Sequence, residues 1–228
     1  MENDRIVPPE RIAGKGWLAL IGGGEFSFGE TEVADRLWLS KLDAGAKVGF
    51  LPAASGSTEY GGHFADYLRE AFGRQVETIP IYRSRDARRA KNLGRVAACG
   101  ALYLGGGVVD QLLDAVRDTP AAEALAEKLR GGGVVTAIAA SAQALGQVAP
   151  SLLRHELVDA LAWLPGGAVA TNFDPRDERP LRRLLEHPVV RWGLGIPSGA
   201  AVLLGPGGEV EIVGAAFIVD GDGEIRKL

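Results

Sequence analysis

Residues 133–146 read Gly-Val-Val-Thr-Ala-Ile-Ala-Ala-Ser-Ala-Gln-Ala-Leu-Gly, and this stretch decides the class of fold. Residues 134–139 form an apolar run with β-branched side chains, which is typical of a buried strand. The run ends at Ser141, and helix-forming residues follow. A strand that leads through a serine into a helix is the layout of a nucleophile elbow. Ser141 is therefore the candidate nucleophile.

Similar apolar runs occupy the sequence on the N-terminal side of this stretch. They lie at 17–21, 47–51, 76–81 and 101–104, and stretches with helical spacing lie at 31–42, 62–72, 110–116 and 121–130. Strands that are apolar on both faces, with helices between them, indicate a parallel sheet covered on both sides. Beyond residue 180 we expect a short helix at 181–185 and short strands at 200–204, 210–213, 215–219 and 224–226, where Gly-rich turns favour antiparallel hairpins. The predicted fold class is α/β, a three-layer sandwich with a mostly parallel central sheet and antiparallel C-terminal hairpins.

Composition limits the class of protein. The chain has 228 residues, of which 46% are apolar, and this suits one large domain over 1–228 with residues 1–14 as an N-terminal arm. A net charge of −4 implies no general affinity for nucleic acid, and the basic stretch at 83–91 is interpreted as a solvated helix face. No signal peptide or membrane-spanning run is evident, so we expect a soluble cytoplasmic protein without a membrane partner. A homodimer is expected from the prevalence of dimers among soluble oligomers.

Neither a metal nor a cofactor is expected. The single cysteine, Cys99, excludes an internal disulfide and a cysteine-based metal site, and the three histidines are far apart in sequence. Acidic and arginine side chains at 174–183 predict an ion-paired helix start rather than a cation site. The first glycine triplet, at 22–24, lacks the third glycine of a dinucleotide motif because position 27 is serine, and no Walker lysine follows.

The two glycine triplets nevertheless lie at informative places. Both 22–24 and 105–107 follow predicted strands, so they should share with Ser141 the edge of the sheet where ligands bind. Backbone N–H groups of the second triplet could form an oxyanion hole. The elbow itself departs from the usual pattern, which has glycines two residues to either side of the nucleophile. Those positions hold Ala139 and Gln143 here, and Gln143 adds a polar side chain to the crevice.

Together these motifs resemble the serine peptidase family that contains peptidase E and cyanophycinase. The matching segments are 21–25, 51–56, 103–107, 110–113, the Ser141 region, Asn172-Phe173 with Arg176, and 193–196. The resemblance spans residues 17–219 and implies a fold similar to class I glutamine amidotransferases, with a flavodoxin-like sheet. It also implies that Ser141 is the nucleophile, with an oxyanion hole from the backbone N–H groups of Gly106 or Gly107 and of Ala142.

The departures from the family pattern bear on activity. Asn172 stands where the resemblance places the histidine base, and Ser198 where it places an acid. An asparagine amide has no usable basicity near neutral pH, so it cannot take the proton of a serine. One interpretation is a non-peptidase homologue that binds a small polar molecule or peptide, with Gln143 and Asn172 lining the crevice. The alternative is a serine hydrolase acting on aspartyl or related peptides with a relocated base, for which His155 is the best candidate. The sequence leaves both open.

Overall fold

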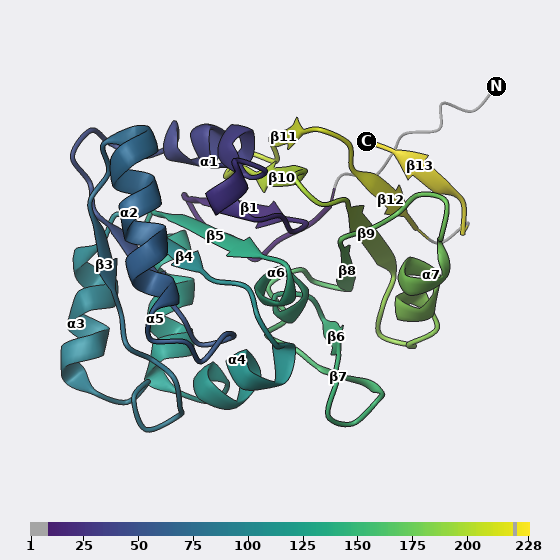
Figure 1. Ribbon diagram of the computed structural model, residues 1–228. Coiled ribbons are helices and arrows are strands. Elements are labelled where there is room, and N and C mark those ends of the chain that lie inside the picture. Colours follow the sequence, from purple (N-terminus) through teal and green to yellow (C-terminus); the bar gives the residue numbers. More distant parts are fainter. Residues whose placement is uncertain (1–8, 221–222) are drawn as a thin grey trace.

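The larger of two main sheets contains the predicted parallel strands (Figure 1). The computed structural model describes residues 9–220 and 223–228, and this sheet has the order β11-β10-β1-β5-β4-β2-β3. Strands β1, β5, β4, β2 and β3 run parallel, whereas β10 and β11 are antiparallel to their neighbours. The strands are β1 (Trp17–Ile21), β2 (Val48–Leu51), β3 (Val76–Thr78), β4 (Ala101–Leu104), β5 (Val134–Ile138), β10 (Ala201–Leu204) and β11 (Val210–Val213).

Helices cover both faces of this sheet, which confirms the predicted three-layer α/β fold. Helices α1 (Glu32–Leu39) and α2 (Tyr60–Phe72) pack on one face, and α3 (Ala90–Ala98), α4 (Val109–Val116) and α5 (Pro120–Arg130) pack on the other. Strand β4 shows why both faces must be apolar: Tyr103 packs with Trp38 of α1, while Leu102 belongs to the opposite core cluster. Successive side chains of a strand point to opposite faces, so a strand covered on both sides reads as a continuous apolar run.

A smaller sheet lies beside the larger one, on the same side as α7 (Arg179–Leu185) (Figure 1). Its order is β13-β12-β9-β8, with β8 (Gly167–Thr171), β9 (Trp192–Ile196), β12 (Phe217–Val219) and β13 (Ile225–Lys227). The hairpins β10–β11 and β12–β13 are antiparallel, as predicted. The parallel pair β8–β9 was not predicted. Three short elements complete the chain: η1 (Phe26–Phe28), α6 (Ala140–Ala144) and the hairpin of β6 (Val148–Pro150) with β7 (Leu157–Asp159).

The expected N-terminal arm is corrected in part. Residues 1–8 lie outside the described residues, but the segment from residue 9 to 14 is held against the domain. The Ile12 N–H donates to Trp163 O at 2.8 Å. The Arg11 guanidinium donates to four backbone carbonyls, those of Leu204, Ile12, Gly14 and Gly16. This part of the segment is therefore packed structure rather than a free arm.

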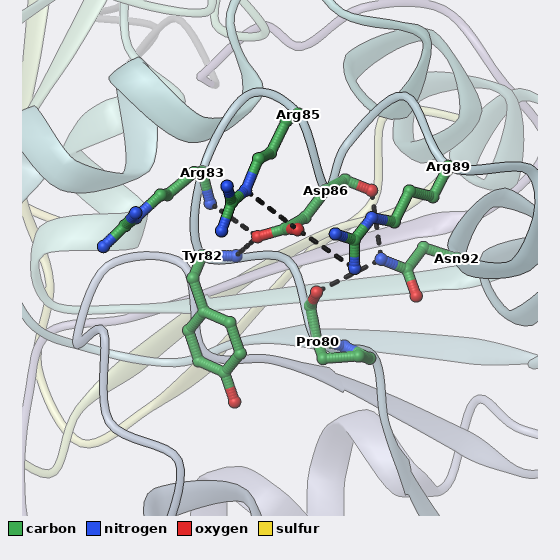
Figure 2. Close-up of polar contacts among 7 residues, drawn as sticks. All are labelled: Pro80, Tyr82, Arg83, Arg85, Asp86, Arg89 and Asn92. Atoms are coloured by element: carbon green, nitrogen blue, oxygen red, sulfur yellow. Dashed lines mark hydrogen bonds and ion pairs between the residues drawn. The ribbon is translucent and has the colours of Figure 1, made fainter.

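The arginine-rich segment is also different from the sequence interpretation. Residues 83–89 form a turn, and helix α3 begins only at Ala90. Asp86 is 6% exposed and its carboxylate accepts hydrogen bonds from the N–H groups of Tyr82 and Arg83 (Figure 2). The Asn92 amide donates to the carbonyls of Pro80 and Asp86. A buried aspartate that satisfies backbone N–H groups favours a turn over a helix at these residues.

Candidate functional site

The carboxyl ends of β1, β5 and β4 bring the predicted site segments to one edge of the sheet. The strands are in register there, with Ile21 opposite Ile138 and Leu104 opposite Ala137. The chain leaving β5 remains bound to β1, because the Ala139 N–H donates to Ile21 O at 2.9 Å. Both glycine triplets and the turn after β5 therefore lie together, as expected for the ligand-binding edge of a parallel sheet.

The strained residue between β5 and α6 is Ala139, not Ser141. Ala139 has φ 50° and ψ −118°, a backbone conformation that non-glycine residues rarely adopt. A nucleophile elbow places its nucleophile on such a strained strand-to-helix turn. Gly106 also lies beside this residue: a Cβ placed on Gly106 would be 3.8 Å from the Ala139 Cβ. The strained turn therefore lies two residues before Ser141, the position that the sequence favoured, and the residue in that turn carries only a methyl group.

Ser141 lies inside α6 as its second residue and is fully buried. Its Oγ donates a hydrogen bond of 2.6 Å to the carbonyl of Gly105. The hydroxyl has one proton, which this bond uses, and no exposed surface from which it could reach a substrate. Through this hydrogen bond Ser141 links α6 to the turn after β4.

The residues predicted to form the oxyanion hole and the crevice do not all lie beside the strained turn. Gly106 lies next to Ala139, as described above. Gly107 has φ +148°, and a Cβ there would approach Ala54 O to 2.2 Å, so close backbone packing requires glycine at this position.

Ala142 is fully buried in α6. The residue that follows the strained turn is Ala140, so an elbow centred on Ala139 would take its second oxyanion donor from the Ala140 N–H rather than from that of Ala142. Gln143 is partly exposed on α6.

Asn172 and Ser198 reach the same edge from the smaller sheet. Asn172 follows β8, and its N–H donates to Gly22 O at 2.8 Å. Its side chain covers Gly23, where an added Cβ would lie 2.0 Å from the Asn172 Oδ1. Ser198 is exposed in the turn after β9, and the next N–H, of Gly199, donates to Gly23 O at 2.9 Å. The structure thus gathers Ala139, Asn172 and Ser198 around the first glycine triplet.

His155 is not brought to Ser141. It is exposed in the turn between β6 and β7, and its carbonyl accepts a hydrogen bond from Arg183 of α7. The Ser141 proton is already donated to Gly105, so the prediction of His155 as a relocated base for Ser141 has no geometric support.

Tyr60 of α2 borders the turn after β4, and no sequence motif marks it. Its ring lies 3.0 Å from the place of a Cβ on Gly105. Burial raises the pKa of the Tyr60 phenol, and a hydrogen bond from the backbone of Gly106 partly opposes that rise. Tyr60 also lines a cavity of about 420 Å³ together with Glu25, Phe26, Ser27, Ser57, Glu59 and His63. A cavity lined mainly by polar residues thus lies beside the tyrosine that contacts Gly106.

Within residues 9–220 and 223–228, no group of three or more His, Cys, Asp or Glu side chains is arranged to hold a metal ion. The acidic residues near α7 pair with arginines instead, as predicted: Asp174 with Arg176 and Asp177 with Arg179. In the same described part of the chain, no helix has the length and apolar character needed to span a membrane.

Comparisons with known proteins agree with this architecture. The model of Peptidase family S51 matches residues 18–204. A cyanophycinase of Synechococcus elongatus is 23% identical over 217 residues, which are 90% of this chain and 67% of that protein. A cyanophycinase of Trichormus variabilis is 24% identical over 215 residues, 88% of this chain and 72% of that protein.

Two solved structures share the fold. A peptidase from an acI-B1 Actinobacterium superposes with a TM-score of 0.78 at 22% identity, covering 95% of this chain and 96% of that one. A peptidase E protein from Listeria monocytogenes EGD-e superposes with a TM-score of 0.64 at 20% identity, covering 87% of this chain and 98% of that one.

Proposed function

Because the chain belongs to peptidase family S51, we propose that it is a member without peptide hydrolysis that binds a small polar molecule or peptide at the former reaction centre. The observation that carries the proposal is Ala139 at the strained turn after β5. A methyl group cannot attack a carbonyl carbon, so covalent catalysis has no nucleophile at this position. The fold persists without it.

The neighbouring substitutions support the same proposal. Asn172 replaces the base that the family resemblance implies, and Ser198 replaces the acid. Each is exposed at the sheet edge and can both donate and accept hydrogen bonds. These groups suit recognition of a polar ligand better than proton transfer, because neither titrates near neutral pH.

Ser141 is the only serine that the sequence offered as nucleophile, and its environment disfavours that role. Activation would require its proton to leave the Gly105 carbonyl for a base, and its side chain is fully buried. We therefore assign Ser141 a structural role.

Labelling with a serine-directed fluorophosphonate, combined with assays on aspartyl dipeptides and cyanophycin, tests the proposal. We expect no labelled peptide and no hydrolysis by the wild-type protein, under conditions in which an active serine peptidase reacts completely. Stoichiometric labelling of Ser141 together with turnover would refute the proposal and restore the hydrolase interpretation.

A gain-of-function variant tests the position of the lost nucleophile. We expect the triple variant Ala139→Ser/Asn172→His/Ser198→Glu to be labelled at position 139, because it returns a nucleophile, a base and an acid to the three gathered sites. The matched control carries Ala140→Ser in place of Ala139→Ser and should remain unlabelled. If the folded triple variant is labelled no more than this control, the assignment of Ala139 to the nucleophile position is wrong.

A further inference from the structure

A second cavity lies between the turn after β3 and helix α4. Its volume is about 410 Å³, and its polar lining consists of Tyr82, Arg83, Ser84, Gln111 and Asp114. A volume of this size lies within the range of small-molecule sites. The segments that form it adjoin the sheet edge, because α4 begins just after the second glycine triplet and Gly56 completes the wall.

The charges in this cavity are opposite and do not neutralise each other. Across the part of the chain that the structure describes, the Arg83 guanidinium and the Asp114 carboxylate have neither a hydrogen bond nor an ion pair, with each other or with other groups. One wall therefore offers a positive group and another a negative group. Ser84 and Gln111 add a hydroxyl and a carboxamide to the lining.

The free Arg83 side chain contrasts with its neighbours. Figure 2 shows Arg85 and Arg89 turned toward Asp86, at 3.9 Å and 3.4 Å, whereas the Arg83 side chain extends away from it. Asp86 nevertheless holds the backbone of Arg83 in place, because its carboxylate accepts a hydrogen bond of 3.2 Å from the Arg83 N–H. The Arg83 side chain therefore extends from a backbone that is held in place.

We propose that this cavity binds a zwitterionic ligand of the α-amino acid class. The Arg83 guanidinium pairs with the ligand carboxylate through its fork of N–H donors, and Asp114 pairs with the ligand ammonium group. A ligand with only one of these charges would leave the other protein charge unpaired. The cavity is thereby selective for molecules that carry both.

This site is separate from Ala139, so the inference goes beyond the proposed function and does not depend on the loss of hydrolysis. It is tested by binding alone, whereas the proposed function is tested by labelling and turnover. Failure of either leaves the other standing.

Isothermal titration of the purified protein with each of the twenty common L-amino acids provides the test. We expect saturable 1:1 binding of at least one of them. The N-acetyl and the carboxamide derivatives of that amino acid should each bind about tenfold more weakly or worse, because each lacks one charge.

Variants locate the binding. Arg83→Met and Asp114→Asn should each weaken it about tenfold or more, while the matched controls Arg85→Met and Asp118→Asn keep wild-type affinity. Circular dichroism of every variant establishes that it is folded. The proposal is overturned if no amino acid binds saturably, if the singly charged derivatives bind equally well, or if Arg83→Met and Asp114→Asn bind like their controls.

Discussion

At the scale of single residues, the site is governed by one backbone conformation. Ala139 holds φ 50° and ψ −118° without a reactive side chain that would justify the strain. Strain of this kind costs of order 1–3 kcal/mol and usually accompanies function. Its persistence at an alanine fits an inherited turn whose geometry is imposed by the hydrogen bond to Ile21 and by the packing of α6.

Relief of this strain is measurable. We expect Ala139→Gly to raise the free energy of unfolding by about 1 kcal/mol, since glycine adopts this conformation readily and the gain exceeds its entropic cost in the unfolded chain. Ala142→Gly is the control, and in the interior of α6 it should lower stability by about 1 kcal/mol. Urea denaturation measures both. A destabilised Ala139→Gly would mean that the turn is not strained.

A second prediction at the scale of single residues concerns the hydroxyl of Ser141. Ser141→Ala removes the hydroxyl that satisfies the Gly105 carbonyl, and a lost buried hydrogen bond costs about 1–2 kcal/mol. We expect this loss in urea denaturation, with no change in the affinity for a ligand that binds at the proposed site. A loss of ligand affinity without any loss of stability would instead assign Ser141 to the site.

At the scale of elements, the Asp110 carboxylate of α4 forms hydrogen bonds with the β6–β7 hairpin. Asp110 accepts hydrogen bonds from Ser151 Oγ at 2.5 Å and from the N–H of Leu152 at 3.0 Å. Burial alone would raise the pKa of Asp110, but these hydrogen bonds and that from the Leu153 N–H outweigh it and place the pKa below its usual value. The ionised form is therefore the one that holds the hairpin.

This depressed pKa predicts a pH dependence of stability. An acid whose pKa is lower in the folded than in the unfolded state stabilises the fold above the unfolded value, about 3.9, and loses that contribution as the pH falls through the folded value. We expect Asp110→Asn to cost about 1–2 kcal/mol at pH 7 and progressively less below about pH 4. Urea denaturation across this range measures it, with the exposed Asp114→Asn as control. A cost that is independent of pH would contradict the role of the ionised carboxylate.

Some strands could be predicted from the sequence and others could not. The strands of the parallel sheet were predicted because burial on both faces makes them continuous apolar runs. Strand β9 was missed because Gly193 and Gly195 lower its strand propensity, yet the structure needs both, since Leu181 and Phe173 pack where their side chains would be. The strained turn lies two residues before Ser141, and the sequence did not locate it because an apolar run of alanines does not reveal where the backbone turns. Asn172 and Ser198 were proposed for the site from the order of motifs, and they lie in the turns after β8 and β9, beside the first glycine triplet.

At the scale of the whole molecule, the two main sheets share one core. Trp192 and Leu194 of β9 belong to the same buried cluster as Leu18 of β1 and Leu102 of β4. Helix α6 lies between the sheets and contacts both β5 and β8. Separation of the smaller sheet would expose this shared apolar surface to water at a cost proportional to its area.

The shared core predicts that the chain unfolds as one unit. Trp38 packs on the larger sheet and Trp192 belongs to the smaller one, so the variants Trp38→Phe and Trp192→Phe shift the fluorescence signal between the two regions. We expect the urea midpoint from tryptophan fluorescence to coincide, in each variant, with that from far-UV circular dichroism, because coincident probes mark a cooperative transition. Two midpoints within one variant would mean that the smaller sheet is a separate folding unit. The proposed site would then be formed by two units, since Asn172 and Ser198 follow strands of one sheet and Ala139 follows a strand of the other.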